Sequence, residues 1–349
     1  MKTIIQKLWI IIAMLCTSSY ASAYDFEVDG ICYDITSFTD FTVTATSLSE
    51  NNKESVFIPS NVMFQGKNLS VQSVEKNFAN KNSTIKEVTI SEGITSIGDS
   101  AFTKCINLSN IVMPNTIKTI GNYAFAETAI VEAIWPNVQS VGDAAFNGCK
   151  SLKSVSLEKI KKASKNLFAN CIALNEVELS TVNTFESDVF LNCESLEEFI
   201  ISDSVTSVNG TIFSNCTKLN KVIIGNGLTT LSCNLFSKCP NLKKLIFNDG
   251  LSPLLFTYAT GEAKYSEWRG PNSGYVDAYG CFDNLNLKEI YIGRDLKGGE
   301  SSYLCICTPF LGHQSLETVT IGTNVTSLPM ASKEGLKVGF FQGCSTLKH

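Results

Sequence analysis

The sequence has little of what an enzyme uses. Only two histidines occur in 349 residues, His313 and His349, and neither stands in a pattern with a nucleophile and an orienting acid. There is no glycine-rich phosphate loop, zinc-ligand motif or calcium loop. These absences argue against nucleophilic, nucleotide-dependent and metal-dependent catalysis. We therefore expect no enzymatic activity, no cofactor and no bound metal.

Basic residues are too few to favour a nucleic-acid partner. The chain has 28 lysines and arginines against 33 acidic residues, a net charge of −5, whereas a nucleic-acid surface needs a basic face. Acidic side chains such as Glu176, Glu178 and Glu198 recur along the expected strands, and paired carboxylates can serve glycoside hydrolysis. Neighbouring strands bring carboxylates close together in any such sheet, so their proximity does not indicate catalysis. We prefer the interpretation that these side chains form a solvent-exposed polar face.

Long apolar runs are missing beyond the N-terminus, so no transmembrane segment is expected. The N-terminus itself has Lys2 and Lys7, an apolar run at 8–15 and small residues at 21–23. This is the layout of a secretory signal peptide with an apolar core too short to span a bilayer. We expect cleavage after this segment and an exported chain, at the cell surface, in the periplasm or secreted. A lipid anchor at Cys16 is the less favoured alternative.

What the sequence has in abundance is an internal repeat. A phenylalanine recurs at steps of 21 to 24 residues, usually followed three positions later by cysteine and then by a leucine that opens an LxxVxI run. Such β-branched, alternating runs predict short strands. The phenylalanines are Phe78, Phe102, Phe125, Phe146, Phe168, Phe190, Phe213 and Phe236, and the pattern resumes at Phe282, Phe310 and Phe341.

One unit of this repeat cannot form a core alone. A turn that often carries glycine follows each strand, and a short segment then ends in an apolar pair such as Ala101-Phe102. That segment is too short for an independent helix, so we expect a single helical turn or an irregular stretch. Stacked units would bury their apolar columns against each other. The sequence therefore predicts an α/β-type repeat solenoid.

The cysteines raise the question of disulfides, which exported proteins commonly contain. Seven of them occupy one position of the repeat: Cys105, Cys149, Cys171, Cys193, Cys216, Cys239 and Cys344. Thr128, Leu285 and His313 stand at the same position in other units, which a pairing scheme would not tolerate. We predict a column of buried free thiols, with disulfides between rungs as the alternative. Bridges remain open for the cysteines outside the column, Cys32, Cys233, Cys281, Cys305 and Cys307.

Units such as VTISEGITSIGDSAFTKCINL (88–108) resemble the BspA-type leucine-rich repeats of exported bacterial proteins, especially those of Bacteroides-like organisms. The resemblance covers roughly residues 70–349 and weakens between 163 and 190 and after 250. It implies a curved, right-handed superhelix with a parallel sheet on the concave face and short helical or irregular segments opposite. It also implies surface adhesion or binding to host proteins.

The ends of the chain depart from the repeat. Residues 24–72 do not carry the repeat, and apolar residues alternate with others on both sides of Asp29-Gly30, a hairpin signal. We therefore expect an N-terminal β cap there, after a signal peptide at 1–23. The solenoid is then expected over 73–349. A further strand should begin at Leu347, two residues before the sequence stops. Either the natural chain continues, or the last repeat closes in an irregular way.

The spacing also breaks between Phe236 and Phe282, where we place an aromatic insertion at about 251–281. Long loops on a rigid scaffold often carry function, and aromatic and arginine side chains are enriched at binding hot spots. The insertion holds four such candidates, Tyr265, Trp268, Arg269 and Tyr275. An alternative interpretation is that they pack over a small core of the insertion itself.

A second candidate surface lies on the expected strands. If the L, V and I of LxxVxI point inward, the residue between V and I points outward. That column reads Thr89, Val112, Ile134, Ser156, Glu178, Ile200, Ile223, Ile246, Tyr291 and Thr320. We hypothesise that its apolar part, from Ile200 to Tyr291, and the insertion together form one binding surface. Sideways packing between neighbouring β-branched residues is the simpler alternative.

The function expected from these observations is binding or adhesion, with a host, extracellular-matrix or cell-surface protein as the partner. A glycan-binding accessory module is the alternative, because aromatic side chains such as Trp268 and Tyr275 can stack on sugar rings. A structural spacer without a ligand is the third possibility.

Overall fold

The structure is a computed structural model. It describes residues 24–257 except 233, and beyond them residues 265–268, 275–280, 282, 285–298, 300–301, 305–327, 331–333 and 336–348. The expected signal peptide at 1–23, Arg269, Cys233 and Cys281 lie outside the described residues. Among the residues described, none belongs to a helix long and apolar enough to span a membrane.

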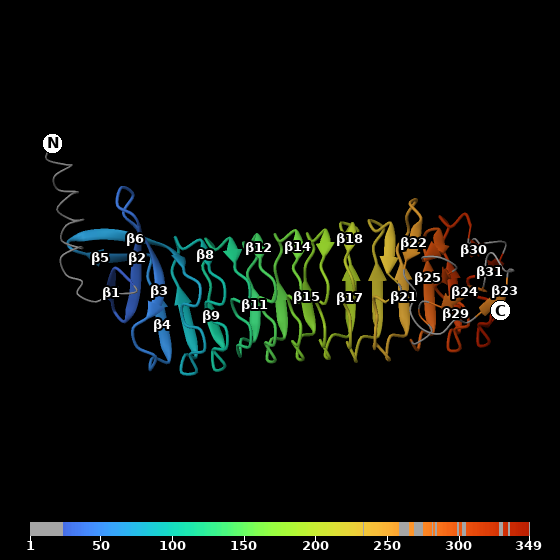
Figure 1. Cartoon of the computed structure of the whole chain (residues 1–349), viewed down its shortest axis with the longest axis horizontal. Helices are drawn as coiled ribbons and strands as arrows, with labels where there is room; N and C mark the ends of the chain where they lie inside the picture. Colours follow the sequence, from blue (N-terminus) through green and yellow to red (C-terminus); the bar gives the residue numbers. More distant parts are fainter. Residues whose placement is uncertain are drawn as a thin grey trace.

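The repeats stack along one long axis, with the N-terminal strands at one end and the insertion strands at the other (Figure 1). Every LxxVxI run forms a strand of what we call the front face. The front strands are β4 (Ser55–Ile58), β7 (Glu87–Ile90), β9 (Asn110–Val112), β11 (Glu132–Ile134), β13 (Ser154–Ser156), β15 (Glu176–Glu178), β17 (Glu198–Ile201), β19 (Lys221–Ile224), β21 (Lys244–Phe247), β25 (Glu289–Ile292) and β29 (Thr318–Ile321). They pair in parallel within three sheets, β4-β7-β9, β11-β13-β15 and β17-β19-β21-β25-β29.

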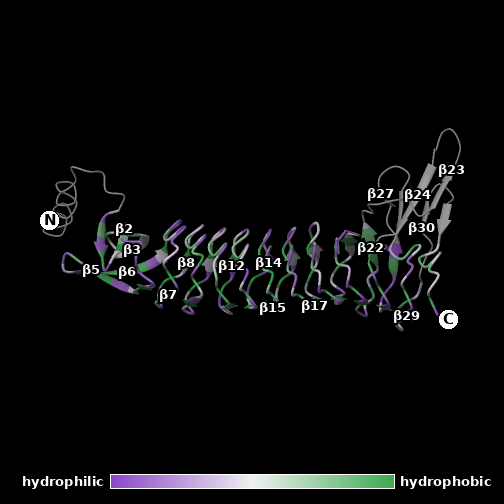
Figure 2. Ribbon diagram, turned by 90° about the horizontal axis from the view of Figure 1, so that it is seen from below, coloured by the Kyte–Doolittle hydropathy of each residue, from purple (hydrophilic) through white to green (hydrophobic). Residues whose placement is uncertain are grey.

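A second line of parallel strands forms the back face, on the opposite side of the stack (Figure 2). These strands are β6 (Lys67–Val74), β8 (Ser96–Ile97), β10 (Thr119–Ile120), β12 (Ser140–Val141), β14 (Lys162–Ala163), β16 (Thr184–Phe185), β18 (Ser207–Val208), β20 (Thr230–Ser232), β22 (Leu254–Thr257) and β26 (Leu296–Gly298). The sequence prediction missed them, because most are only two or three residues long and carry no periodic signal.

The remaining strands lie at the two ends. Near the N-terminus, β1 (Phe26–Val28), β2 (Ile31–Ser37), β3 (Thr42–Leu48) and β5 (Asn61–Phe64) join the back-face sheet through β6. In the expected insertion and beyond it lie β23 (Tyr265–Trp268), β24 (Tyr275–Gly280), β27 (Glu300–Ser301), β28 (Cys305–Thr308), β30 (Ala331–Lys333) and β31 (Leu336–Val338). Strands β23-β24-β28-β27 form a sheet of their own.

The expected α/β class is wrong in one respect: every regular element among the described residues is a strand. From Phe102 to Phe190, the segment before each phenylalanine is a turn, because one of its residues has a positive φ, as at Ser100 (55°) and Tyr123 (55°). A left-handed residue cannot continue a right-handed helix. Close stacking adds to this, since a Cβ on Gly121 would lie 2.5 Å from the backbone nitrogen of Asp99.

The phenylalanine column lies in the core as predicted. Consecutive rings from Phe102 to Phe236 stack with centroids 5.5–5.8 Å apart and interplanar angles of 3–17°, and all are buried. The repeat solenoid of parallel strands is thus confirmed. The stack does not close on itself (Figure 1), and the right-handed superhelix and concave face stay predictions.

The thiols of the described column are free, and all are buried except the half-buried Cys344. Each sulfur donates a hydrogen bond to a carbonyl of the preceding repeat, for example Cys171 to Phe146 at 3.1 Å and Cys193 to Phe168 at 3.2 Å. The same carbonyls also accept a hydrogen bond from a backbone amide of their own repeat, as from Cys149 to Phe146 at 3.1 Å. The thiol therefore adds a second bond to the carbonyl and links one repeat to the next. Cys32 is also free and buried. The side chains of Cys305 and Cys307 lie outside the described residues.

Candidate binding surface

The outward column of the front face is brought into direct register. Ile200 pairs with Ile223, Ile223 with Ile246, and Ile246 with Tyr291 across β17, β19, β21 and β25. The inward neighbours, such as Val222 and Ile224, are fully buried, so strand alternation forces this column outward. We call Ile200, Ile223, Ile246 and Tyr291 the apolar stripe.

The stripe is only partly covered by its own neighbours. Ile200 is 62% exposed, while Ile223, Ile246 and Tyr291 are half-buried. Sideways packing thus accounts for part of the burial along the stripe. It leaves Ile200 in solvent at one end.

Charged pairs flank the stripe two residues earlier along each strand. Glu198 and Lys221 form an ion pair at 2.8 Å, and Lys244 and Glu289 form another at 2.7 Å. Their side chains are 31–58% exposed, and such surface pairs contribute little to stability. They give the stripe a polar rim of balanced charge, the arrangement typical of protein interfaces.

Tyr291 is held in place at the end of the stripe. Its hydroxyl donates a hydrogen bond of 2.8 Å to Asp249 Oδ1. That hydrogen bond, with some burial, raises the pKa of the Tyr291 phenol above its ordinary value. The phenol is therefore neutral at physiological pH, and its hydroxyl is held by Asp249.

The insertion residues lie in another sheet. Trp268 of β23 pairs directly with Tyr275 of β24, and Tyr265 pairs with Ala278. The sheet they belong to meets the stack where β28 contacts β22 and β26, which are back-face strands. The stripe and the insertion strands thus belong to separate sheets, and the structure does not place them on one continuous sheet surface.

Further exposed apolar residues occupy the same outward column nearer the N-terminus. Phe57 is 61% exposed, Ile134 49% and Val112 48%. The repeat predicts Val112 and Ile134 in this column, although they are not among the candidate binding residues. The repeat does not predict Phe57 in the column, because β4 precedes the first phenylalanine of the repeat.

Metal-ligating and nucleophilic side chains were sought among the described residues. No three histidine, cysteine or acidic side chains come together there in a way that could hold a metal ion, and His313 is buried in the core. Burial raises the pKa of the Cys105 thiol to about 12 and that of Cys149 to about 11. These thiols stay protonated at neutral pH and are poor nucleophiles.

Comparison with known proteins agrees with the repeat. A family model described as the BspA type leucine-rich repeat region matches residues 72–197 and 183–309 in six copies. No curated protein matches the chain. A solved structure of a leucine-rich cell surface protein from Faecalibacterium prausnitzii is similar, with a TM-score of 0.54 and 19% identity over 95% of each chain.

A second solved structure, a leucine-rich repeat protein from Bacteroides ovatus, is 22% identical with a TM-score of 0.45, over 93% of this chain and 94% of that one. At such identities the likeness to the Faecalibacterium prausnitzii protein supports the fold and not a shared partner.

Proposed function

The chain belongs to the family of proteins with BspA-type leucine-rich repeats, and from that premise we propose that it is an exported binding or adhesion protein of a Bacteroides-like bacterium. Its front face engages a host, extracellular-matrix or cell-surface protein, and it catalyses no reaction. The observation that supports this most is the apolar stripe, four apolar or aromatic side chains in register with Ile200 62% exposed.

The stripe has the composition of an interface centre. Isoleucine and tyrosine side chains in one line offer apolar area and a rigid aromatic edge, and the ion pairs beside them form a polar rim. In this proposal the chain is organised as a signal peptide at 1–23, an N-terminal β cap at 24–72 and the solenoid at 73–349, whose front face is the concave one.

A glycan-binding module is the second candidate, supported by one observation. Trp268 and Tyr275 are directly opposite each other in β23 and β24, and cross-strand aromatic pairs of this kind can offer a stacking platform to a sugar ring. In that case the insertion, with Tyr265 and Arg269, would carry the function and the stack would be its support.

Two substitutions separate these candidates. The purified mature chain is tested on immobilised fibronectin, laminin and collagen, and on a glycan array. If the front face binds, Ile200→Glu abolishes protein capture and Trp268→Ala leaves it unchanged. If the insertion binds a glycan, Trp268→Ala abolishes glycan binding and Ile200→Glu leaves it unchanged.

The matched control is Val112→Glu, which places the same charge at an exposed position of the same column, away from the stripe. It should leave binding unchanged. A wild-type chain that captures none of these proteins and no glycan contradicts both candidates and favours a structural spacer.

A further inference from the structure

A groove of about 480 Å³ lies at the N-terminal end of the stack, outside the apolar stripe. One wall is β4, with Ser55, Val56 and Phe57, and the other walls come from β5 and from the β1–β2 hairpin. Phe57 and Met63, which line it, are 61% and 60% exposed. Two large, exposed apolar side chains in one groove mark a surface suited to an apolar ligand.

The β4 wall is also an unpaired sheet edge. Among the described residues β4 pairs only with β7. The carbonyls of Glu54 and Ile58 accept hydrogen bonds from the β7 side, from the amides of Glu87 and Ser91. Because backbone groups alternate in direction along a strand, the N–H and C=O groups of Ser55 and Phe57 point the other way, toward the open edge.

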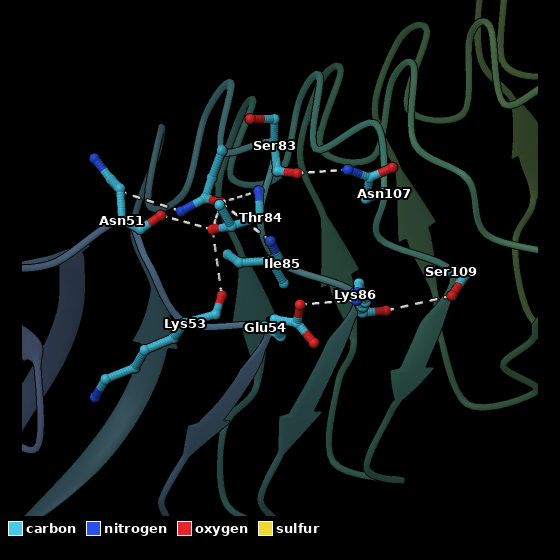
Figure 3. A network of polar contacts seen from close by, with 10 residues as sticks. Asn51, Lys53, Glu54, Ser83, Thr84, Ile85, Lys86, Asn107 and Ser109 are labelled. Carbon is cyan, nitrogen blue, oxygen red and sulfur yellow. Dashed lines mark hydrogen bonds and ion pairs between the residues drawn. The ribbon is translucent and has the colours of Figure 1, made fainter.

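The segment leading into β4 is anchored on its β7 side (Figure 3). The Thr84 hydroxyl donates a hydrogen bond of 2.6 Å to the carbonyl of Asn51, and Asn82 donates one of 3.2 Å to the Asn51 side chain. Lys86 and Glu54 form an ion pair at 2.8 Å. The edge is therefore held in a strand conformation before any ligand arrives, which lowers the entropy cost of binding.

We propose that this groove binds an extended peptide segment of another protein, which adds to β4 as a new edge strand. Only an extended polypeptide repeats N–H and C=O groups at the spacing that Ser55 and Phe57 present. Alternate apolar side chains of the peptide contact Phe57 and Met63. Asp29 and Lys53 also line the groove with opposite charges, so the segment needs no net charge there.

The test uses the mature chain and a fluorescein-labelled peptide of alternating valine and threonine flanked by lysines, followed by fluorescence polarisation. A second peptide has the same side chains but carries a methyl group on every backbone nitrogen, which removes the N–H groups of both edges. The wild-type chain is expected to bind the first peptide and not the second.

Three variants locate the site. Phe57→Pro removes an amide that points to the open edge and leaves the hydrogen bonds to β7 intact, and Phe57→Glu keeps the amide but charges the wall. Each should weaken peptide binding about tenfold or more. Ile134→Glu, at a position with 49% exposure outside both the groove and the apolar stripe, is the matched control and should bind the peptide normally.

Circular dichroism verifies that each variant is folded. If Phe57→Pro does not fold, the peptide binding of Phe57→Glu alone tests the proposal. Absence of peptide binding by the wild-type chain, equal binding of both peptides, or normal binding by Phe57→Glu would overturn the proposal. A dimer that Phe57→Pro converts to monomer would overturn it too, because the occupant would then be a second copy. The stripe proposal is tested through Ile200→Glu on other ligands, so the two can fail separately.

Discussion

At the residue scale, the core depends on aromatic side chains that contact several others at once. The Phe190 ring lies 5.8 Å from that of Phe168, 5.5 Å from Phe213 and 4.8 Å from Phe199, measured between centroids. It is fully buried. This ring has neighbours above, below and beside it. Its removal therefore leaves a cavity that the surrounding side chains cannot easily fill.

We therefore expect Phe190→Ala to lower the free energy of unfolding by about 3–5 kcal/mol. Urea unfolding followed by circular dichroism measures it. The control is Phe57→Ala, at a side chain that is 61% exposed, which should change the free energy of unfolding by less than about 0.5 kcal/mol. Similar losses for the two variants would contradict the stacked core.

Residue-level prediction from the sequence was accurate for the core and incomplete at the surface. The recurrence of phenylalanine and cysteine predicted both buried columns, because a side chain repeated at every step of a stack must lie in a shared interior. The exposure of Phe57 could not be predicted, since the sequence around β4 resembles the repeat only in its Val56-Phe57-Ile58 alternation.

At the scale of the element, the thiol column links each turn to the one before it. Burial raises the pKa of the Cys105 thiol to about 12 and of Cys149 to about 11. Below the ordinary thiol pKa, near 9, both folded and unfolded chains keep these protons. Above it the unfolded chain loses them first, so the free energy of unfolding falls as pH rises toward about 11–12.

We expect a loss of about 1.4 kcal/mol per pH unit for each such thiol in that window, measured by urea unfolding at pH about 8 and about 10. The double variant Cys105→Ala/Cys149→Ala should be less stable at both pH values but less sensitive to the change. An unchanged pH dependence in the double variant would contradict this role of the thiols.

The front strands were predictable as elements and the back strands were not. Each LxxVxI run carries its own alternation, whereas a pair such as Thr119-Ile120 becomes a strand only because Ser96-Ile97 and Ser140-Val141 lie beside it. The turns were also beyond prediction. A positive φ at an ordinary residue such as Tyr123 is imposed by the stacking of its neighbours.

At the scale of the whole molecule, the stack should behave as a sum of units and their interfaces. Removal of residues 172–193 takes out one complete step, including β15 and β16, and lets Cys171 replace Cys193 in the column. We expect the shortened chain to fold with lower stability and a long axis about 4.8 Å shorter, measured by thermal unfolding and small-angle scattering.

The control for this deletion is removal of residues 172–182 alone, which is half a step and puts the phenylalanine and thiol columns out of register. That chain should not fold. If both deletions fold equally well, the repeat is not the unit of stability.

The sequence by itself determined the repeat unit, the buried columns and the front strands. Each of these follows from side chains that recur at one period, because such side chains occupy equivalent positions in every unit of the stack. Only the tertiary structure decided that the apolar stripe and the insertion aromatics belong to separate sheets, and that β4 ends in an open edge beside a groove. Those features depend on which backbones lie next to each other, and adjacency is set by how the units pack rather than by any unit's own residues.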